Sequence, residues 1–172
     1  IDAGREMLRH PVETLPFVAE TLACLTGRYR IIRITKGDLF DQERKLAQSG
    51  LGEFFHGVEI VSEKTPQVYR RIFDRHGDGP DRAVMVGNSM KSDIVPAIAA
   101  GCWGVFIPHE LTWTLEHAEA PIHHPRFRQL KSLNELHEFI TKTSRCGDVG
   151  NTAAGEGIRS LDPDLGKARD RV

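Results

Sequence analysis

The sequence predicts an α/β fold in which helices cover both faces of a parallel sheet. Short segments rich in β-branched residues alternate along the chain with longer amphipathic segments, and most are bounded by glycine or proline. Strands that alternate with helices of about ten residues imply right-handed crossovers and therefore a parallel sheet. A chain of 172 residues, of which 40% are hydrophobic, is large enough for one domain with a sizeable core.

Four segments have the composition of strands in such a sheet. The third of them, Ala83-Val84-Met85-Val86, is apolar without interruption and stops at Gly87, as expected for a strand buried on both faces. The four predicted strands are residues 29–35, 58–61, 83–86 and 103–107.

Helix start and stop signals fill the intervals between these strands. Asp38 is a predicted N-cap of a helix that stops at Gly50, and Thr65 followed by Pro66 marks another helix start. Residues 132–135, Ser-Leu-Asn-Glu, have the pattern of a capping box. The predicted helices are residues 17–25, 39–49, 65–73 and 92–100, and a last one that begins at Ser132.

The pattern divides the chain into a domain and a tail. Residues 1–143 contain all the predicted strands and helices. From residue 144 onward glycine, aspartate, arginine and alanine dominate and large apolar side chains are few. Residues 144–172 are therefore predicted to be a disordered or weakly ordered tail.

Composition excludes several classes of protein. The chain has 23 basic and 24 acidic residues and a net charge of −1, so no broad field attracts nucleic acid or an anionic membrane. No apolar run reaches the roughly 18 residues of a membrane span. The three cysteines are far apart, which argues against a disulfide framework and predicts a reducing, cytoplasmic location. We interpret His123-His124 as an incidental exposed pair rather than a metal site, and no feature specifies an oligomeric state.

Polar side chains gather where the predicted strands end. In a parallel sheet, ligands bind outside the carboxyl ends of the strands. The residues that follow the first three strands there are Thr35 to Asp38, Ser62 to Thr65, and Gly87 to Asp93. A hydroxyl, an ammonium and a carboxylate thus meet at one edge. This set suits phosphoryl transfer, in which donors hold the phosphate oxygens and a carboxylate holds Mg²⁺.

Each of these residues also has an ordinary structural explanation. Thr35 could cap its loop, Lys64 could be a solvated surface lysine, and Asn88 could close a turn after Gly87. Asp93 could complement the dipole of the helix that it begins. Their consecutive order at the ends of successive strands favours a functional site.

Three of these segments resemble the motifs of the haloacid dehalogenase (HAD) superfamily. Residues 32–38, Ile-Arg-Ile-Thr-Lys-Gly-Asp, resemble its second motif, a hydrophobic strand that ends in Thr or Ser. Lys64, just before a Thr-Pro helix start, resembles the lysine of the third motif. Residues 84–94, VMVGNSMKSDI, resemble the fourth motif, commonly hhhGDSxxxD. The similarity extends over about residues 11–111 and the helix that begins at Ser132.

The resemblance implies a three-layer α/β/α Rossmann-like core and a phosphatase mechanism. In this family an aspartate attacks phosphorus to form an aspartyl-phosphate, and a second aspartate two residues later acts as general acid and base. By position, Thr35 and Lys64 would be catalytic, and Thr35, Lys36 and Lys64 would bind the phosphate of a small phosphorylated metabolite. Asn88 and Asp93 would be the metal residues for a Mg²⁺ cofactor.

Two departures from the family pattern shape the expectation for this chain. Asn88 stands where many members have aspartate, which removes one negative charge from the metal site. No DxDx[TV] motif follows a hydrophobic strand, and Asp2-Ala3-Gly4-Arg5 lacks the second aspartate. We therefore expect this chain to be the C-terminal part of a HAD core that has no nucleophile and is inactive alone.

The missing motif also has a structural consequence. Without the nucleophile strand, the strands ending at Thr35 and Gly87 would present unpaired edges. The cap that selects the phosphomonoester would also lie upstream.

Other readings remain open beside the Mg²⁺-dependent phosphatase. One is a non-catalytic HAD-like module that a partner chain completes. Another is haloacid dehalogenation, which uses the same scaffold without magnesium, although Asp93 favours the phosphatase. A flavodoxin-like or response-regulator domain would need acidic residues after its first strand, and no such signature is visible.

Overall fold

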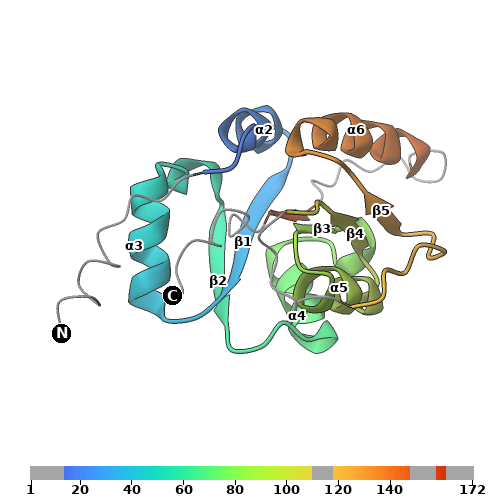
Figure 1. Cartoon of the computed structure of the whole chain (residues 1–172), viewed down its shortest axis with the longest axis horizontal. Coiled ribbons are helices and arrows are strands. Elements are labelled where there is room, and N and C mark those ends of the chain that lie inside the picture. The colour runs from blue at the N-terminus through green and yellow to red at the C-terminus, as the bar shows by residue number, and fades with distance from the viewer. Residues whose placement is uncertain (1–13, 110–117, 148–157, 162–172) are drawn as a thin grey trace.

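A computed structural model describes residues 14–109, 118–147 and 158–161 of the chain as a sheet between helices (Figure 1). The strands are β1 (Arg30–Lys36), β2 (Gly57–Val61), β3 (Val84–Gly87), β4 (Trp103–Phe106), β5 (Phe127–Gln129) and β6 (Ile158–Leu161). The helices are α2 (Val18–Thr26), α3 (Leu39–Ser49), α4 (Pro66–His76), α5 (Val95–Ala100) and α6 (Leu136–Gly147). Short helical turns are η1 (Gly52–Phe54), η2 (Pro80–Arg82), η3 (Met90–Ile94) and η5 (Leu133–Glu135).

The six strands form one sheet in the order β2-β1-β6-β3-β4-β5. Every neighbouring pair is parallel, so all strands end at the same edge. The predicted parallel α/β sheet is thereby confirmed. Within the described residues, no helix is long and apolar enough to cross a membrane.

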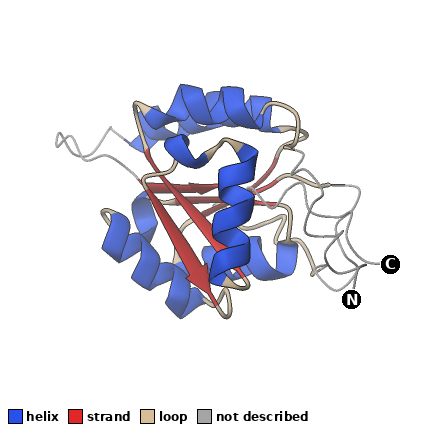
Figure 2. Cartoon of the chain, turned by 90° about the vertical axis from the view of Figure 1, so that its left-hand side faces the viewer, coloured by secondary structure: helices blue, strands red, loops and turns tan. Residues whose placement is uncertain are grey.

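Helices cover both faces of the sheet, as the turned view in Figure 2 shows. Because side chains alternate along a strand, odd and even residues of β1 point to opposite faces. One core holds Ile31 with α2 and α6, and the other holds Ile32 and Ile34 with α4 and α5. The strands therefore bury side chains on both faces, which explains their continuous apolar composition.

The helix boundaries follow the signals in the sequence. The Asp38 side chain accepts a hydrogen bond from the Asp41 backbone N–H at 3.2 Å, and α3 ends at Gly50 with a left-handed φ of 67°. The Thr65 hydroxyl accepts from the Val68 N–H at 3.3 Å, with Pro66 in the first turn of α4. The predicted N-caps Asp38 and Thr65 are confirmed.

Three elements differ from the prediction. The predicted helix 92–100 is preceded by a wider, π-helical turn over Met90–Ile94, and α5 begins only at Val95. Ser132 makes no side-chain cap, because the chain there starts with the 3₁₀ turn η5 before α6. A short edge strand, β5, had no signal in the sequence, since it is three residues long and pairs only with β4.

The middle of the sheet is the largest difference from expectation. β6 lies between β1 and β3 and pairs with both, so these strands do not present the unpaired edges that the sequence predicted. The predicted tail thus contributes β6, and α6 continues to Gly147. The remainder of residues 144–172 lies outside the described residues. The backbone N–H and C=O groups of β1 and β3 that face each other across this position are a strong template for a further strand.

Candidate functional site

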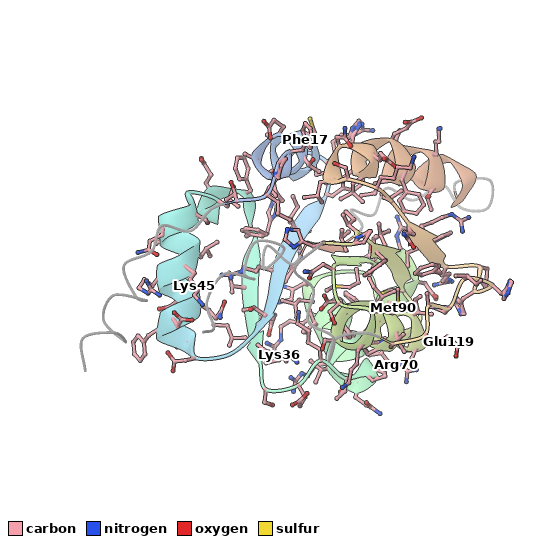
Figure 3. The ribbon with its side chains drawn as sticks, viewed as in Figure 1. Phe17, Lys36, Lys45, Arg70, Met90 and Glu119 are labelled. Atoms are coloured by element: carbon pink, nitrogen blue, oxygen red, sulfur yellow. The ribbon has the colours of Figure 1, made fainter. Side chains whose placement is uncertain are left out.

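The loops after β1, β2 and β3 meet at the carboxyl edge of the sheet. Figure 3 shows Lys36 at the end of β1, with Met90 on the neighbouring turn after β3. The Lys36 Nζ donates a hydrogen bond to the Ser92 hydroxyl at 3.3 Å. The Tyr69 hydroxyl, from α4, donates to the Ser92 carbonyl oxygen at 3.2 Å. The turn over Met90–Ile94 is therefore held from both β1 and α4.

A buried ion pair joins the second and third loops. The Lys64 Nζ lies 2.8 Å from the Asp93 Oδ1, and their side chains are only 5% and 2% exposed. A buried carboxylate or ammonium without a partner costs several kcal/mol, roughly. The chain thus places two opposite charges, 29 residues apart, at one point beside the strand ends.

Local backbone contacts fix the Asp93 carboxylate. Its Oδ2 accepts a hydrogen bond from the Ser89 N–H at 3.1 Å, and the Ser89 hydroxyl accepts from the Ser92 N–H at 2.8 Å. A Cβ at Gly87 would lie 2.7 Å from the Cβ and Cγ of Asp93, closer than real Cβ atoms approach. The glycine that ends β3 therefore leaves the space in which the carboxylate sits.

Thr35 is part of a second buried polar group on the other face of β1. Its hydroxyl donates to the Gln42 Oε1 at 3.1 Å and, more weakly, to the Lys36 carbonyl oxygen at 3.3 Å. Arg33, two residues earlier and on the same face, donates to both the side-chain and backbone oxygens of Gln42. Thr35, Gln42 and Arg33 are all buried.

Oxygen donors at this edge have the chemistry that a hard divalent cation requires. Mg²⁺ takes one or two carboxylates and completes its shell with water and substrate phosphate. Asp93 supplies a buried carboxylate and half-buried Asn88 supplies an amide oxygen. Both Asp93 oxygens already accept one hydrogen bond, which leaves lone pairs but favours an orienting role. Among the described residues, no three His, Cys, Asp or Glu side chains cluster as a metal site.

The buried cysteine is not a competing nucleophile. Burial raises the pKa of the Cys102 thiol to about 12, against a weaker opposing effect of hydrogen bonds and of Arg126. A thiol with so high a pKa stays protonated at neutral pH, and only the thiolate is a strong nucleophile. Cys102 therefore fills the core between α5 and β4 as a small apolar side chain.

The structure brings together most of the residues that the sequence singled out. Lys64 and Asp93 are in direct contact, and Lys36 reaches the same turn through Ser92. Thr35 lies one residue before the end of β1, but its hydroxyl donates to Gln42 on α3 rather than to this turn.

Sequence reasoning missed Arg33 and Gln42. From the sequence alone, a polar side chain in a strand or on an amphipathic helix is predicted to face solvent. Only the alternation of Arg33 with Thr35 along β1 could have suggested that the two share a face.

Comparisons with known proteins agree with the fold. The family profile described as "Hydrolase: haloacid dehalogenase-like hydrolase" matches residues 2–101, more than half of the chain. A solved haloacid dehalogenase-like family hydrolase from Xanthomonas campestris superposes with a TM-score of 0.74 at 37% identity. That match covers 85% of this chain and 62% of the other.

Two curated relatives have named activities. A glyceraldehyde 3-phosphate phosphatase from Methanothermobacter thermautotrophicus is 34% identical over 103 residues, covering 56% of this chain and 46% of the relative. The pyrimidine 5'-nucleotidase YjjG from Escherichia coli is 29% identical over 138 residues, covering 74% of this chain and 57% of the relative. The chain thus spans about half the length of the curated relatives that it matches.

Proposed function

Because the chain belongs to the haloacid dehalogenase-like hydrolases, we propose that it forms the phosphate-binding part of a Mg²⁺-dependent phosphomonoesterase. The observation that carries this proposal is the buried Lys64–Asp93 pair, which lies beside Lys36 at the carboxyl edge of a parallel sheet. Two ammonium groups at one edge offset the charge of a phosphoryl group. Both curated relatives act on phosphorylated small molecules by their names, which supports the same substrate class here.

The residues of the site have separate tasks in this proposal. Lys64 holds the phosphoryl oxygens close to the attacking group, while Lys36 adds positive charge from the neighbouring strand. The Thr35 hydroxyl donates to a phosphoryl oxygen. Asp93, with Asn88, holds Mg²⁺ or the water around it, and the cation supplies charge neutralisation at the phosphate when bound.

The chemistry requires a carboxylate nucleophile beside these residues. A carboxylate oxygen attacks phosphorus, the bond from phosphorus to the ester oxygen breaks, and the leaving alcohol takes a proton from a general acid. Water then attacks the phosphorus of the acyl phosphate, which releases inorganic phosphate and restores the carboxylate. In the family resemblance this residue is an aspartate on a central strand, and our leading proposal is that a segment beyond these 172 residues supplies it.

The position of β6 favours a second source for that carboxylate. Leu161, its last residue, pairs with Val86 one residue before the end of β3. The sequence continues with Asp162, Pro163 and Asp164, two aspartates with one residue between them. These three residues lie outside the described residues, and this alternative rests on the position of β6 and on the sequence.

Binding of inorganic phosphate tests the proposed site directly. Isothermal titration calorimetry of the 172-residue chain should show binding that Mg²⁺ strengthens. Lys64→Ala should weaken phosphate binding by about tenfold or more, because a preorganised cation is lost. Asp93→Asn should remove the effect of Mg²⁺. Lys142→Ala, at an exposed lysine on α6, is the matched control and should bind as the wild type does.

Hydrolysis of p-nitrophenyl phosphate distinguishes the two sources of the nucleophile. The 172-residue chain should show no Mg²⁺-dependent turnover if the carboxylate lies elsewhere. Turnover that Asp162→Asn abolishes and Asp170→Asn leaves intact would identify Asp162 instead. A folded Lys64→Ala variant that binds phosphate like the wild type would contradict the proposed function itself.

A further inference from the structure

Gln42 is a buried glutamine on α3, a helix whose other residues are half-buried or exposed. It is the one buried residue of α3 and is only 4% exposed. Next to it on the same helix, Leu39 and Phe40 are 49% and 76% exposed. A buried amide is costly unless it is hydrogen-bonded, so the contacts of Gln42 matter more than its packing.

The contacts of Gln42 fix the direction of its amide. The Arg33 Nη2 donates to the Gln42 Oε1 at 2.9 Å, and the Arg33 Nη1 donates to the Gln42 backbone oxygen at 3.0 Å. A guanidinium only donates, so the oxygen of the amide, and not its nitrogen, must face Arg33. Gly37 lies against the nitrogen side of the amide: a Cβ added at Gly37 would be 3.1 Å from the Gln42 Nε2.

The fixed amide in turn fixes the proton of Thr35. The Thr35 Oγ1 lies 3.1 Å from the same Gln42 Oε1, which accepts only, so the hydroxyl donates to it and shares its single proton more weakly with the Lys36 carbonyl oxygen at 3.3 Å. Phosphate oxygens are acceptors as well. A phosphoryl group can therefore take the hydroxyl proton only if Thr35 turns it away from Gln42.

Arg33 lowers the free-energy cost of turning the Thr35 hydroxyl away from Gln42. When Thr35 turns, the Gln42 Oε1 keeps the Arg33 Nη2 at 2.9 Å and is not left as a buried acceptor without a donor. Arg33 and Thr35 are 2% and 0% exposed, so water does not compete readily for either group. Arg33 and Thr35 lie on one face of β1, near its end at Lys36, and Gln42 from α3 hydrogen-bonds to both.

We propose that Gln42, held by Arg33, is a positioning residue that holds the Thr35 hydroxyl proton before phosphate binds and releases it to a bound phosphoryl group. This inference rests on the proposed function, because it assumes that Thr35 donates to the phosphate. It adds a residue on α3 to a site otherwise built from the loops after β1, β2 and β3.

Gln42→Glu is the sharpest test. A glutamate keeps both acceptor contacts and pairs with Arg33, so the fold should be as stable as the wild type to urea. The charged oxygen holds the Thr35 hydroxyl more strongly than an amide does. Inorganic phosphate should therefore bind Gln42→Glu about tenfold more weakly, with about the same loss in Thr35→Val. Gln48→Glu, at an exposed glutamine of the same helix, is the matched control.

A double-mutant cycle separates positioning from a merely structural role. In Thr35→Val the proton is already lost, so adding Gln42→Glu should cost much less than it does in the wild type. Losses that simply multiply would overturn the inference, because independent sites are additive in free energy.

A measurement on the wild type covers the case in which a variant fails to fold. The side-chain amide resonance of Gln42 should shift when inorganic phosphate is titrated, and that of Gln48 should not. Phosphate binding that depends on Thr35 but leaves Gln42 unmoved would overturn the inference alone. Absence of phosphate binding to the wild type would overturn the proposed function and the inference together.

Discussion

Two lysine–carboxylate pairs show why burial matters more than distance. The Lys64 Nζ lies 2.8 Å from the Asp93 Oδ1, and the Lys142 Nζ lies 2.5 Å from the Glu138 Oε1. The first pair is 5% and 2% exposed in its side chains, whereas the second is 73% and 69% exposed. We expect the fold to depend on the longer contact, because it is the buried one.

The difference arises from what each charge meets when its partner is removed. On α6, water replaces the lost partner at once, and an exposed pair on a helix surface is worth little. Beside η3, the Asp93 side chain is only 2% exposed, so water cannot replace its partner and an unpaired charge is costly. Buried charges that are kept in this way are candidates for function, and exposed ones are not.

Lys64→Met should have the largest effect on stability. Removing the ammonium leaves the Asp93 carboxylate buried without its partner, which costs about 3–5 kcal/mol. Urea denaturation followed by circular dichroism measures the loss. Adding Asp93→Asn should recover part of it, since no unpaired charge then remains. If the double variant is no more stable than Lys64→Met, the loss does not come from the charge.

Gly87→Ala should have the next largest effect, through the space around the same pair. The new Cβ would lie 2.7 Å from the Asp93 Cβ and Cγ, so the carboxylate must move. Overpacking of this kind costs about 1–3 kcal/mol. Gly27→Ala is the control, because nothing lies within 4 Å of a Cβ there. Equal urea midpoints for the two variants would show that the strand end tolerates a methyl group.

Glu59 lies between the two extremes, and its contribution should depend on pH. Burial raises its pKa, but hydrogen bonds from His76 and Arg75 outweigh burial, so the net pKa lies below the ordinary 4.5. A carboxylate with a lowered pKa stabilises the fold at pH values above 4.5. It loses that contribution as the pH falls through its folded pKa.

Glu59→Gln should therefore destabilise the protein at neutral pH and much less in acid. Urea midpoints of both proteins, measured at neutral pH and well below 4.5, should converge at the lower pH. A constant difference between the two proteins across this range would assign the effect to packing rather than to charge.

Lys142→Met should have the smallest effect. Hydrogen bonding to Lys142 lowers the pKa of Glu138, but the pair is open to solvent. We expect no measurable change in the urea midpoint at physiological ionic strength, where salt screens exposed charges. A clear loss of stability would mean that the short contact on α6 contributes despite its exposure, and would weaken the comparison with Lys64.

The sequence alone determined the elements whose signals are local. α3 runs between its N-cap Asp38 and the left-handed Gly50 as predicted, and the Thr65-Pro66 start of α4 is equally clear. Strand composition then placed Lys64 and Asp93 at the same edge of the sheet, because parallel strands end at a common edge. Caps and periodicity involve residues only a few positions apart, so they can be read without knowing the fold.

The tertiary structure decided which distant groups meet. β6 lies in the middle of the sheet although its segment has a tail-like composition, because pairing with β1 and β3 depends on their open backbone groups rather than on its own propensity. Gln42 is buried because α3 packs over β1, and that contact makes it a partner of Thr35 and Arg33. Such contacts depend on the packing of whole elements, which no local pattern contains.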